Sequence, residues 1–309
     1  MLTLAAALAV MAGPVATEVV LPSQPAPLYG TLLAPPDAWA VAVILPGSGP
    51  TDRDGNSTLG VAASTYRLLA EGLADQGVAT LRIDKRGVAA SAAAGPAEAD
   101  LRFDAYAADA RAWAAEAATR AGKPCAWLIG HSEGALVALK AVQGGHDKVC
   151  GLILLSGAGR PAGAVLREQL ASLPEPTKTQ AFAALTELEA GRTVADAPPA
   201  LAALLRPSVQ PYLISWLPLD PAALLAAYDG PVLIGQGTTD LQVSVTDAQA
   251  LAAADPRATL KLWDGVNHVL KTAPADRAAN MATYADPALP LAPGVTADVA
   301  AFIRAYKVQ

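Results

Sequence analysis

Short runs of apolar residues alternate with longer segments of helical periodicity along most of the chain. The short runs have the near-continuous apolar character of strands that are buried on both faces. They occupy residues 41–45, 78–83, 126–129, 152–155, 232–234 and 260–263. The segments with helical spacing of apolar and alanine residues are 66–76, 106–121, 135–142, 246–254 and 296–306. This alternation predicts an α/β fold with a mostly parallel central sheet and helices on both faces.

Two parts of the chain depart from the alternation. Residues 18–21 and 29–33 predict a leading antiparallel hairpin. The connection from 156 to 232 is far longer than a crossover needs, and it holds helix-like segments at 166–173, 179–189 and 199–205. We therefore expect a body of 17–157 and 230–309, with a helical cap of 158–229 inserted after the sixth strand.

Composition narrows the class of protein. Of 309 residues, 53% are hydrophobic and 16% charged, so the chain has ample apolar surface to fold. The net charge of −6 argues against nucleic acid as a partner. We expect no membrane span, because charges or prolines interrupt every apolar stretch after the N-terminus.

The first residues resemble a removable leader. Residues 1–17 carry no charged side chain, and the apolar run 2–11 ends before Gly13-Pro14. This pattern predicts a signal peptide of 1–16, cleaved after Ala12 or Ala16, and export to the periplasm or medium. The missing Lys or Arg leaves a misassigned start codon or a plain N-terminal strand open, with a cytoplasmic protein if the leader is not cleaved.

The two cysteines, Cys125 and Cys150, stand at the amino ends of two expected strands. If these strands are neighbours, the sulfur atoms lie within bridging range. A disulfide formed in an oxidising compartment and two buried free thiols are equally compatible with this placement. Two cysteines and three histidines lack the spacing of metal ligands, so no metal site is expected.

Gly130-His131-Ser132-Glu133-Gly134 has the G-x-S-x-G pattern of a nucleophile elbow. The motif follows an expected strand and precedes an expected helix, which is the context that this turn requires. A sharp strand-to-helix turn presents the serine hydroxyl at the helix N-terminus, where the dipole favours negative charge. We therefore predict that Ser132 is a nucleophile.

With two further motifs, the chain resembles an α/β-hydrolase, and more narrowly the bacterial serine carboxylesterases. The motifs are Leu45-Pro-Gly-Ser-Gly-Pro-Thr-Asp-Arg-Asp-Gly-Asn56 and Asp84-Lys-Arg-Gly87, and the resemblance runs from about Tyr29 to the C-terminus. It implies an α/β-hydrolase fold, a Ser-His-Asp triad and no cofactor. Two glycines that are usual in the family are replaced here, one by Ala135 and one within Gly87-Val-Ala-Ala-Ser91.

The catalytic histidine and the carboxylate that orients it are predicted from chain order and from the resemblance. His268 lies just after the last expected strand, where the family carries its catalytic histidine, whereas His146 lies in a polar turn. The side chain of His131 is expected to point away from Ser132. Asp240 follows the strand 232–234 and is the predicted orienting carboxylate, with Asp264 as its rival.

An oxyanion hole needs two backbone N–H donors. One is expected from Glu133, the residue after the nucleophile. By resemblance, the other comes from Ser48 in the loop after the strand 41–45. In the same loop we expect Asp52, Arg53 and Asp54 to satisfy one another and brace the hole, with Asp84 and Arg86 doing similar work beneath it.

These residues predict a hydrolase that cleaves small-molecule carboxylic esters. An apolar pocket in the cap is expected to bind the acyl group. Candidate pocket residues are Leu213, Trp216, Leu217, Leu224, Leu225 and Tyr228, at least half of which are expected to pack the cap onto the body instead. A serine peptidase or acyltransferase uses the same triad, and a non-catalytic binding module uses the same scaffold. Cationic anchors for a peptide are available at Arg160, Arg167, Arg192 and Arg206.

Overall fold

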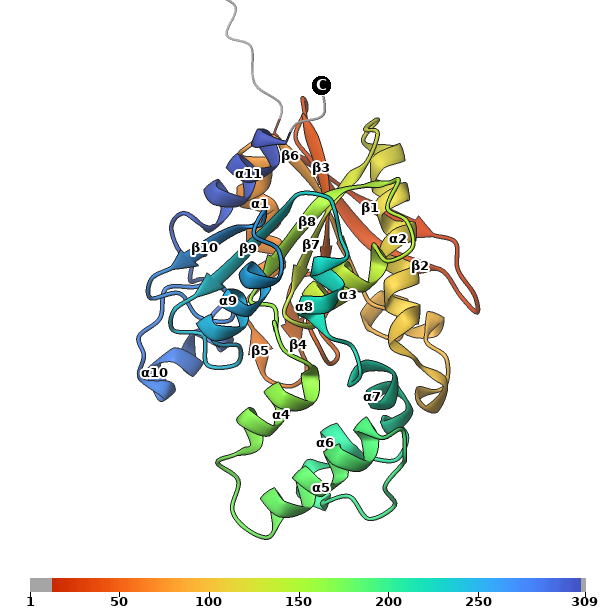
Figure 1. Ribbon diagram of the computed structural model, residues 1–309. Helices are drawn as coiled ribbons and strands as arrows, with labels where there is room; N and C mark the ends of the chain where they lie inside the picture. Colours follow the sequence, from red (N-terminus) through yellow and green to blue (C-terminus); the bar gives the residue numbers. More distant parts are fainter. Residues whose placement is uncertain (1–12, 307–309) are drawn as a thin grey trace, which may run out of the picture.

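One eight-stranded sheet forms the centre of the protein, whose computed structural model describes residues 13–306 (Figure 1). Its strand order is β1-β2-β6-β3-β7-β8-β9-β10. The strands are β1 (Val15–Leu21), β2 (Leu28–Ala34), β3 (Ala40–Leu45), β6 (Val78–Ile83), β7 (Ala126–His131), β8 (Val149–Leu155), β9 (Val232–Gly237) and β10 (Thr259–Trp263). From β6 to β10 neighbours pair in parallel, and β1 and β2 form an antiparallel hairpin at one edge. Both the parallel sheet and the leading hairpin that the sequence predicted are therefore confirmed.

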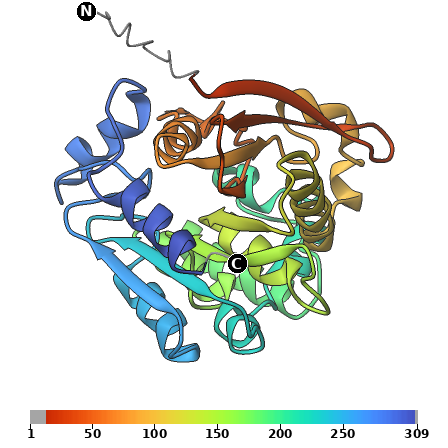
Figure 2. The same ribbon diagram turned by 90° about the horizontal axis from the view of Figure 1, so that it is seen from above.

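Helices cover both faces of this sheet (Figure 2). Along β3, Val41, Val43 and Leu45 pack into one hydrophobic cluster, and Ala42 and Ile44 pack into another on the opposite face. The first cluster also holds α2 (Phe103–Arg120), α3 (Glu133–Ala141) and α9 (Val245–Ala254), and the second holds α1 (Thr65–Ala74) and α11 (Val295–Ala305). Burial on both faces explains why the central strands are almost wholly apolar.

The connection after β8 forms a helical layer at the carboxyl ends of the strands (Figure 1). It contains α4 (Ala162–Leu170), α5 (Thr177–Glu189), η3 (Pro199–Leu201), α6 (Ala202–Leu205), α7 (Gln210–Trp216) and α8 (Pro221–Ala226). The last of these helices, α8, packs on α3 and α9 of the body. The segment expected as a cap, 158–229, thus ends with a helix that belongs to the body by its contacts.

Several short elements carried no periodic signal in the sequence. They are the hairpin β4 (Asn56–Ser57) and β5 (Val61–Ala62), the helix α10 (Arg277–Ala282), and the turns η1 (Ala89–Ala94), η2 (Glu98–Asp100) and η4 (Thr283–Ala285). Elements of two to six residues are too short to repeat an apolar position more than once. In the described part of the chain, no helix is both long and apolar enough to cross a membrane.

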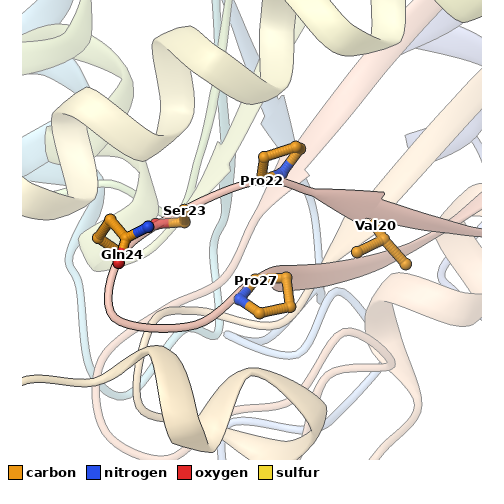
Figure 3. Close-up of a pocket in the computed structure, with 5 residues that line it drawn as sticks. All are labelled: Val20, Pro22, Ser23, Gln24 and Pro27. Atoms are coloured by element: carbon orange, nitrogen blue, oxygen red, sulfur yellow. The ribbon is translucent and has the colours of Figure 1, made fainter.

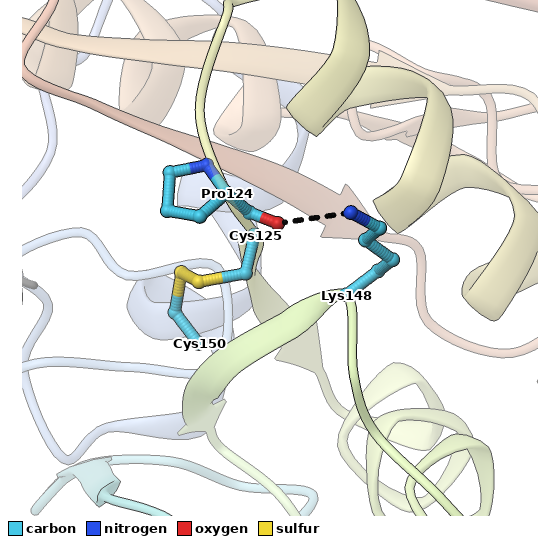
Figure 4. The surroundings of a disulfide bond; sticks show 4 residues. All are labelled: Pro124, Cys125, Lys148 and Cys150. Carbon is cyan, nitrogen blue, oxygen red and sulfur yellow. Dashed lines mark hydrogen bonds between the residues drawn. A yellow bond between two sulfur atoms is a disulfide. The ribbon is translucent and has the colours of Figure 1, made fainter.

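Cys125 and Cys150 form a disulfide between neighbouring parallel strands (Figure 4). Their Cα atoms are 5.3 Å apart, and Cys125 directly precedes β7 while Cys150 lies near the start of β8. Beside the bridge, the ammonium of Lys148 donates to the carbonyl of Pro124 over 3.4 Å. Of the two alternatives that the sequence left open, the structure contains the disulfide.

The expected leader only partly overlaps the described residues. Residues 1–12 lie outside them, whereas Val15 and Ala16 pair with Ala34 and Leu33 in the β1–β2 hairpin. Cleavage after Ala12 would leave β1 whole, and cleavage after Ala16 would remove its first two residues.

Candidate active site

Ser132 stands at the sharp turn between β7, which ends at His131, and α3, which begins at Glu133. Its backbone has φ 55° and ψ −121°, a conformation that a residue with a side chain adopts only under strain. The Ser132 N–H donates to the carbonyl of Leu155 over 2.9 Å, so the turn is tied to β8. The G-x-S-x-G motif therefore has the elbow geometry that its sequence context indicated.

Both glycines of the motif are required by close backbone contacts. A Cβ on Gly130 would lie 2.2 Å from the carbonyl oxygen of Gly134, and one on Gly134 would lie 2.2 Å from that of Leu45. Ala135 stands where the resemblance implies a glycine, and its methyl group fits beside Gly157: a Cβ on Gly157 would lie 2.5 Å from that methyl group. Gly157 thus compensates for this departure.

The structure brings His268 and Asp240 together. His268 follows β10, and its Nδ1 lies 2.8 Å from Asp240 Oδ2, with both side chains almost completely buried. Because a carboxylate only accepts hydrogen bonds, Nδ1 carries the proton and Nε2 is left as the basic nitrogen. Asp240 is itself held by the N–H groups of Gln242 and Val243, over 2.8 and 3.0 Å.

Asp240 is ionised in this arrangement. Burial acts to raise the pKa of the carboxyl group, but the attraction of His268 and the hydrogen bonds from His268, Val243 and Gln242 outweigh it. The net result is a pKa below the usual value of an aspartate. An ionised acceptor of this kind fixes the tautomer of His268.

The rival residues lie elsewhere. Asp264 is exposed and accepts a hydrogen bond from the Thr238 hydroxyl over 3.1 Å. His146 pairs with Asp229 over 2.9 Å, in the turn before β8 and so at the far end of the strands.

His131 is a structural partner of His268 that sequence reasoning missed. Its ring lies 4.8 Å from the His268 ring, and its Nε2 donates to the His268 carbonyl over 2.7 Å. Its Nδ1 then accepts from the Tyr66 hydroxyl over 2.9 Å, and that hydroxyl accepts from the Gly47 N–H over 2.9 Å. Burial, reinforced by the charge of His268, lowers the pKa of His131 to about 3, so this ring is neutral.

Two unpaired N–H groups flank Ser132. Among the described residues, neither the N–H of Ser48 nor that of Glu133 donates to another protein group. Ser48, Ser132 and Glu133 line one cavity. The loop that carries Ser48 approaches the elbow closely, since a Cβ on Gly47 would lie 3.3 Å from the Cβ of Ser132.

The charges of this loop pair with β6 and the segment after it, and the expectation that they satisfy one another was wrong. Arg53 binds Asp84 through its N–H and its guanidinium, and Asp54 contacts Arg82. Asp52 accepts from backbone N–H groups within the turn. The loop beside Ser132 is thus fastened to the sheet.

The cavity at Ser132 has a volume of about 290 Å³ and lies between the body and the cap. Its apolar lining consists of Leu136, Ala158, Ala162, Val165, Leu166, Leu170, Leu204, Trp216, Pro221 and Val243. Of the six cap residues that the sequence suggested, only Trp216 is among them. Helical periodicity could not show that α4 supplies more of this lining than α7 or α8 does.

Both charged side chains that line the cavity already have partners. Glu133 pairs with Lys85, and Arg160 pairs with Asp247 and Glu168. The other arginines considered as anchors bind Glu189, Glu187 and Glu98 and do not line the cavity.

A second hollow lies far from these groups. It measures about 530 Å³ at the turn between β1 and β2 and is lined by Val20, Pro22, Ser23, Gln24 and Pro27 (Figure 3). It is more open than the cavity at Ser132 and has no charged lining residue, so it offers no catalytic chemistry. Within residues 13–306 no cluster of three or more His, Cys, Asp or Glu side chains is placed to hold a metal ion.

Comparison with a family model and with solved structures shows which known proteins have a similar architecture. Residues 59–192 match the family model described as serine aminopeptidase, S33, and none of the curated proteins matches the chain. Est1E from Butyrivibrio proteoclasticus is 18% identical with a TM-score of 0.59, and the alignment covers 96% of this chain and 99% of that one. An esterase domain from a Rhodothermus marinus protein is 19% identical, with a TM-score of 0.58 and coverage of 95% and 99%. Proline iminopeptidase from Mycobacterium smegmatis is 13% identical, with a TM-score of 0.59 and coverage of 94% and 99%. The protein has the α/β-hydrolase fold.

Proposed function

We propose that this protein is a serine hydrolase that cleaves carboxylic esters through an acyl-enzyme on Ser132. His268 acts as general base and general acid, and Asp240 orients and stabilises it. The N–H groups of Ser48 and Glu133 form the oxyanion hole. No cofactor takes part in this chemistry.

The hydrogen bond between His268 and Asp240, together with the strained elbow at Ser132, is the main support for this reaction. It commits Nδ1 of His268 to a buried carboxylate and leaves Nε2 to accept a proton. The packing of His131 against His268 brings that base next to the elbow, because His131 directly precedes Ser132. Two unpaired N–H groups at the same cavity suit a developing oxyanion.

In the first half of the reaction, Ser132 Oγ attacks the ester carbon while His268 Nε2 takes the hydroxyl proton. The carbonyl oxygen becomes an oxyanion held by the two N–H groups. Collapse of the tetrahedral intermediate expels the alcohol, which takes the proton from His268. In the second half, water loses its proton to Nε2 and attacks the acyl-enzyme, which releases the acid and restores the Ser132 hydroxyl.

The cavity favours an uncharged, apolar acyl group. Its walls are mainly aliphatic, and Glu133 and Arg160 are both neutralised by neighbours. A peptidase that anchors a charged terminus needs an unpaired opposite charge at this position. The family description and the iminopeptidase neighbour nevertheless make a peptidase the second candidate.

One substrate panel tests the proposal. We expect wild type to hydrolyse p-nitrophenyl esters of short and medium acyl chains faster than aminoacyl-anilides, and Ser132→Ala to lose this turnover. Ser57→Ala, a serine that does not line the cavity, is the matched control. Full ester turnover by Ser132→Ala would refute the proposal, and faster turnover of anilides would favour the peptidase.

The acyltransferase and the non-catalytic scaffold are separated by other readouts. Added alcohol raises the yield of transfer product at the expense of free acid only if the acyl-enzyme reacts with acceptors other than water. A fluorophosphonate probe labels an activated serine, so a wild-type protein that is not labelled would be a binding module.

We also propose that the protein is exported. The disulfide supports this location, because such bridges form and persist in oxidising compartments. Fractionation of cells that express the full chain tests it: recovery of the protein only from the cytoplasm, with two free thiols, would contradict export.

A further inference from the structure

Lys85 lies at the centre of the contacts beside Ser132, although it is neither a triad residue nor an oxyanion donor. It follows β6, and only 6% of it is exposed. Its ammonium donates to the carbonyl oxygen of Gly47 over 2.6 Å and to Glu133 Oε1 over 3.4 Å. Since the bond to the carbonyl is much shorter, its main contact is with Gly47, and Glu133 balances the buried charge.

The carbonyl of Gly47 belongs to the same peptide group as the N–H of Ser48. In a trans peptide these two groups point in opposite directions. Within the described residues the cis peptide bonds precede Pro25 and Pro176, so the Gly47–Ser48 peptide is trans. An ammonium that holds the carbonyl of Gly47 therefore also sets the direction of the Ser48 N–H.

This peptide needs such a restraint because glycine turns easily. Without a Cβ, Gly47 can rotate its following peptide at little steric cost and so turn the Ser48 N–H away from Ser132. On its other side Gly47 is held by the Tyr66 hydroxyl, which accepts its N–H over 2.9 Å. Tyr66 and Lys85 thus fasten the two peptides that flank Gly47.

The second contact of Lys85 reaches the other side of the oxyanion hole. Glu133 supplies the second proposed N–H donor from its backbone, and its buried side chain is the carboxylate that faces Lys85. The same ammonium therefore touches the peptide of one donor and the side chain of the other.

We propose that Lys85 is a positioning residue that presets the oxyanion hole by fixing the Gly47–Ser48 peptide. This inference rests on the proposed serine-hydrolase function. A hole formed before the substrate arrives requires no peptide rotation in the reaction, so the effect of Lys85 falls on the transition state.

The test compares wild type, Lys85→Met, and the double variant Lys85→Met/Glu133→Gln, with Lys140→Met as control. Lys140 pairs with Asp104 near the surface of α3, so its loss is expected to leave activity unchanged. In Lys85→Met, kcat for a p-nitrophenyl ester is expected to fall about tenfold to a hundredfold, while KM changes less than about threefold. A trifluoromethyl ketone, whose adduct with serine carries an oxyanion, should bind more weakly by a similar factor.

The double variant separates positioning from charge balance. Because it removes both buried charges, its melting temperature is expected to be higher than that of Lys85→Met. It still lacks the restraint on Gly47, so its kcat should stay low. Wild-type kcat in the double variant would overturn the inference and leave the proposed function intact. Absence of ester turnover and of fluorophosphonate labelling in wild type would overturn both.

Discussion

The buried imidazole of His131 makes the stability of this protein depend on pH in a way that a single substitution can isolate. Tyr66 donates to its Nδ1, and the carbonyl of His268 accepts from its Nε2. Besides burial, the charge of His268 lowers the pKa of His131 and the charge of Asp240 acts to raise it. Only a neutral ring satisfies both hydrogen bonds, which agrees with a pKa lowered to about 3, chiefly by burial.

The sign and size of the effect follow from this pKa. In the unfolded chain His131 takes up a proton below its ordinary pKa of 6.5, whereas the folded protein does not until about 3. The folded state therefore keeps its full stability above 6.5 and loses it as the pH falls. The loss is about 1.4 kcal/mol per pH unit, or about 2 kcal/mol between pH 7 and pH 5.

Urea unfolding of wild type and His131→Gln at pH 7, 6 and 5 measures this contribution. Glutamine keeps one donor and one acceptor but does not titrate, so its stability should fall less than that of wild type over this range. Other groups titrate in both proteins and cancel in the comparison. If the two free energies of unfolding fall in parallel, the argument that His131 is buried in its neutral form is refuted.

Three further changes test other parts of the structure. Removing the disulfide with Cys125→Ala/Cys150→Ala releases a loop of 25 residues and should lower the free energy of unfolding by about 3.5 kcal/mol in urea titrations; no loss would contradict the bridge. Ala89 has φ 46°, a conformation that favours glycine, so Ala89→Gly should raise the free energy of unfolding by about 0.5–1 kcal/mol, and a lower melting temperature would argue against strain. Asp240→Asn should lower kcat for esters about 10⁴-fold, and Asp264→Asn should not; the reverse order would exchange the two roles.

The strands and the elbow were predictable because each depends on local sequence. Buried parallel strands are short apolar runs, and the elbow is a five-residue motif between such a run and a helix. Chain order then pointed to Asp240 and His268, and the structure joins them by a hydrogen bond. The proximity of Cys125 and Cys150 followed once their strands were neighbours.

The contacts around Gly47 were not predictable from the same sequence. Tyr66, Lys85 and His131 are distant from Gly47 along the chain, and their roles depend on the direction of single side chains and peptides. Similarly, the charges of the loop after β3 were expected to pair locally, but β6 lies beside β3 in the sheet and offers better-placed partners.

The disulfide stands at the opposite end of β7 from Ser132. Seven residues of extended chain place the bridge roughly 20 Å from the proposed nucleophile. Reduction should therefore leave the rate of each catalytic turnover almost untouched while it shortens the time for which the folded protein survives. The lifetime of the folded protein thus depends on one end of β7 and the proposed turnover on the other end. Each can be altered without the other.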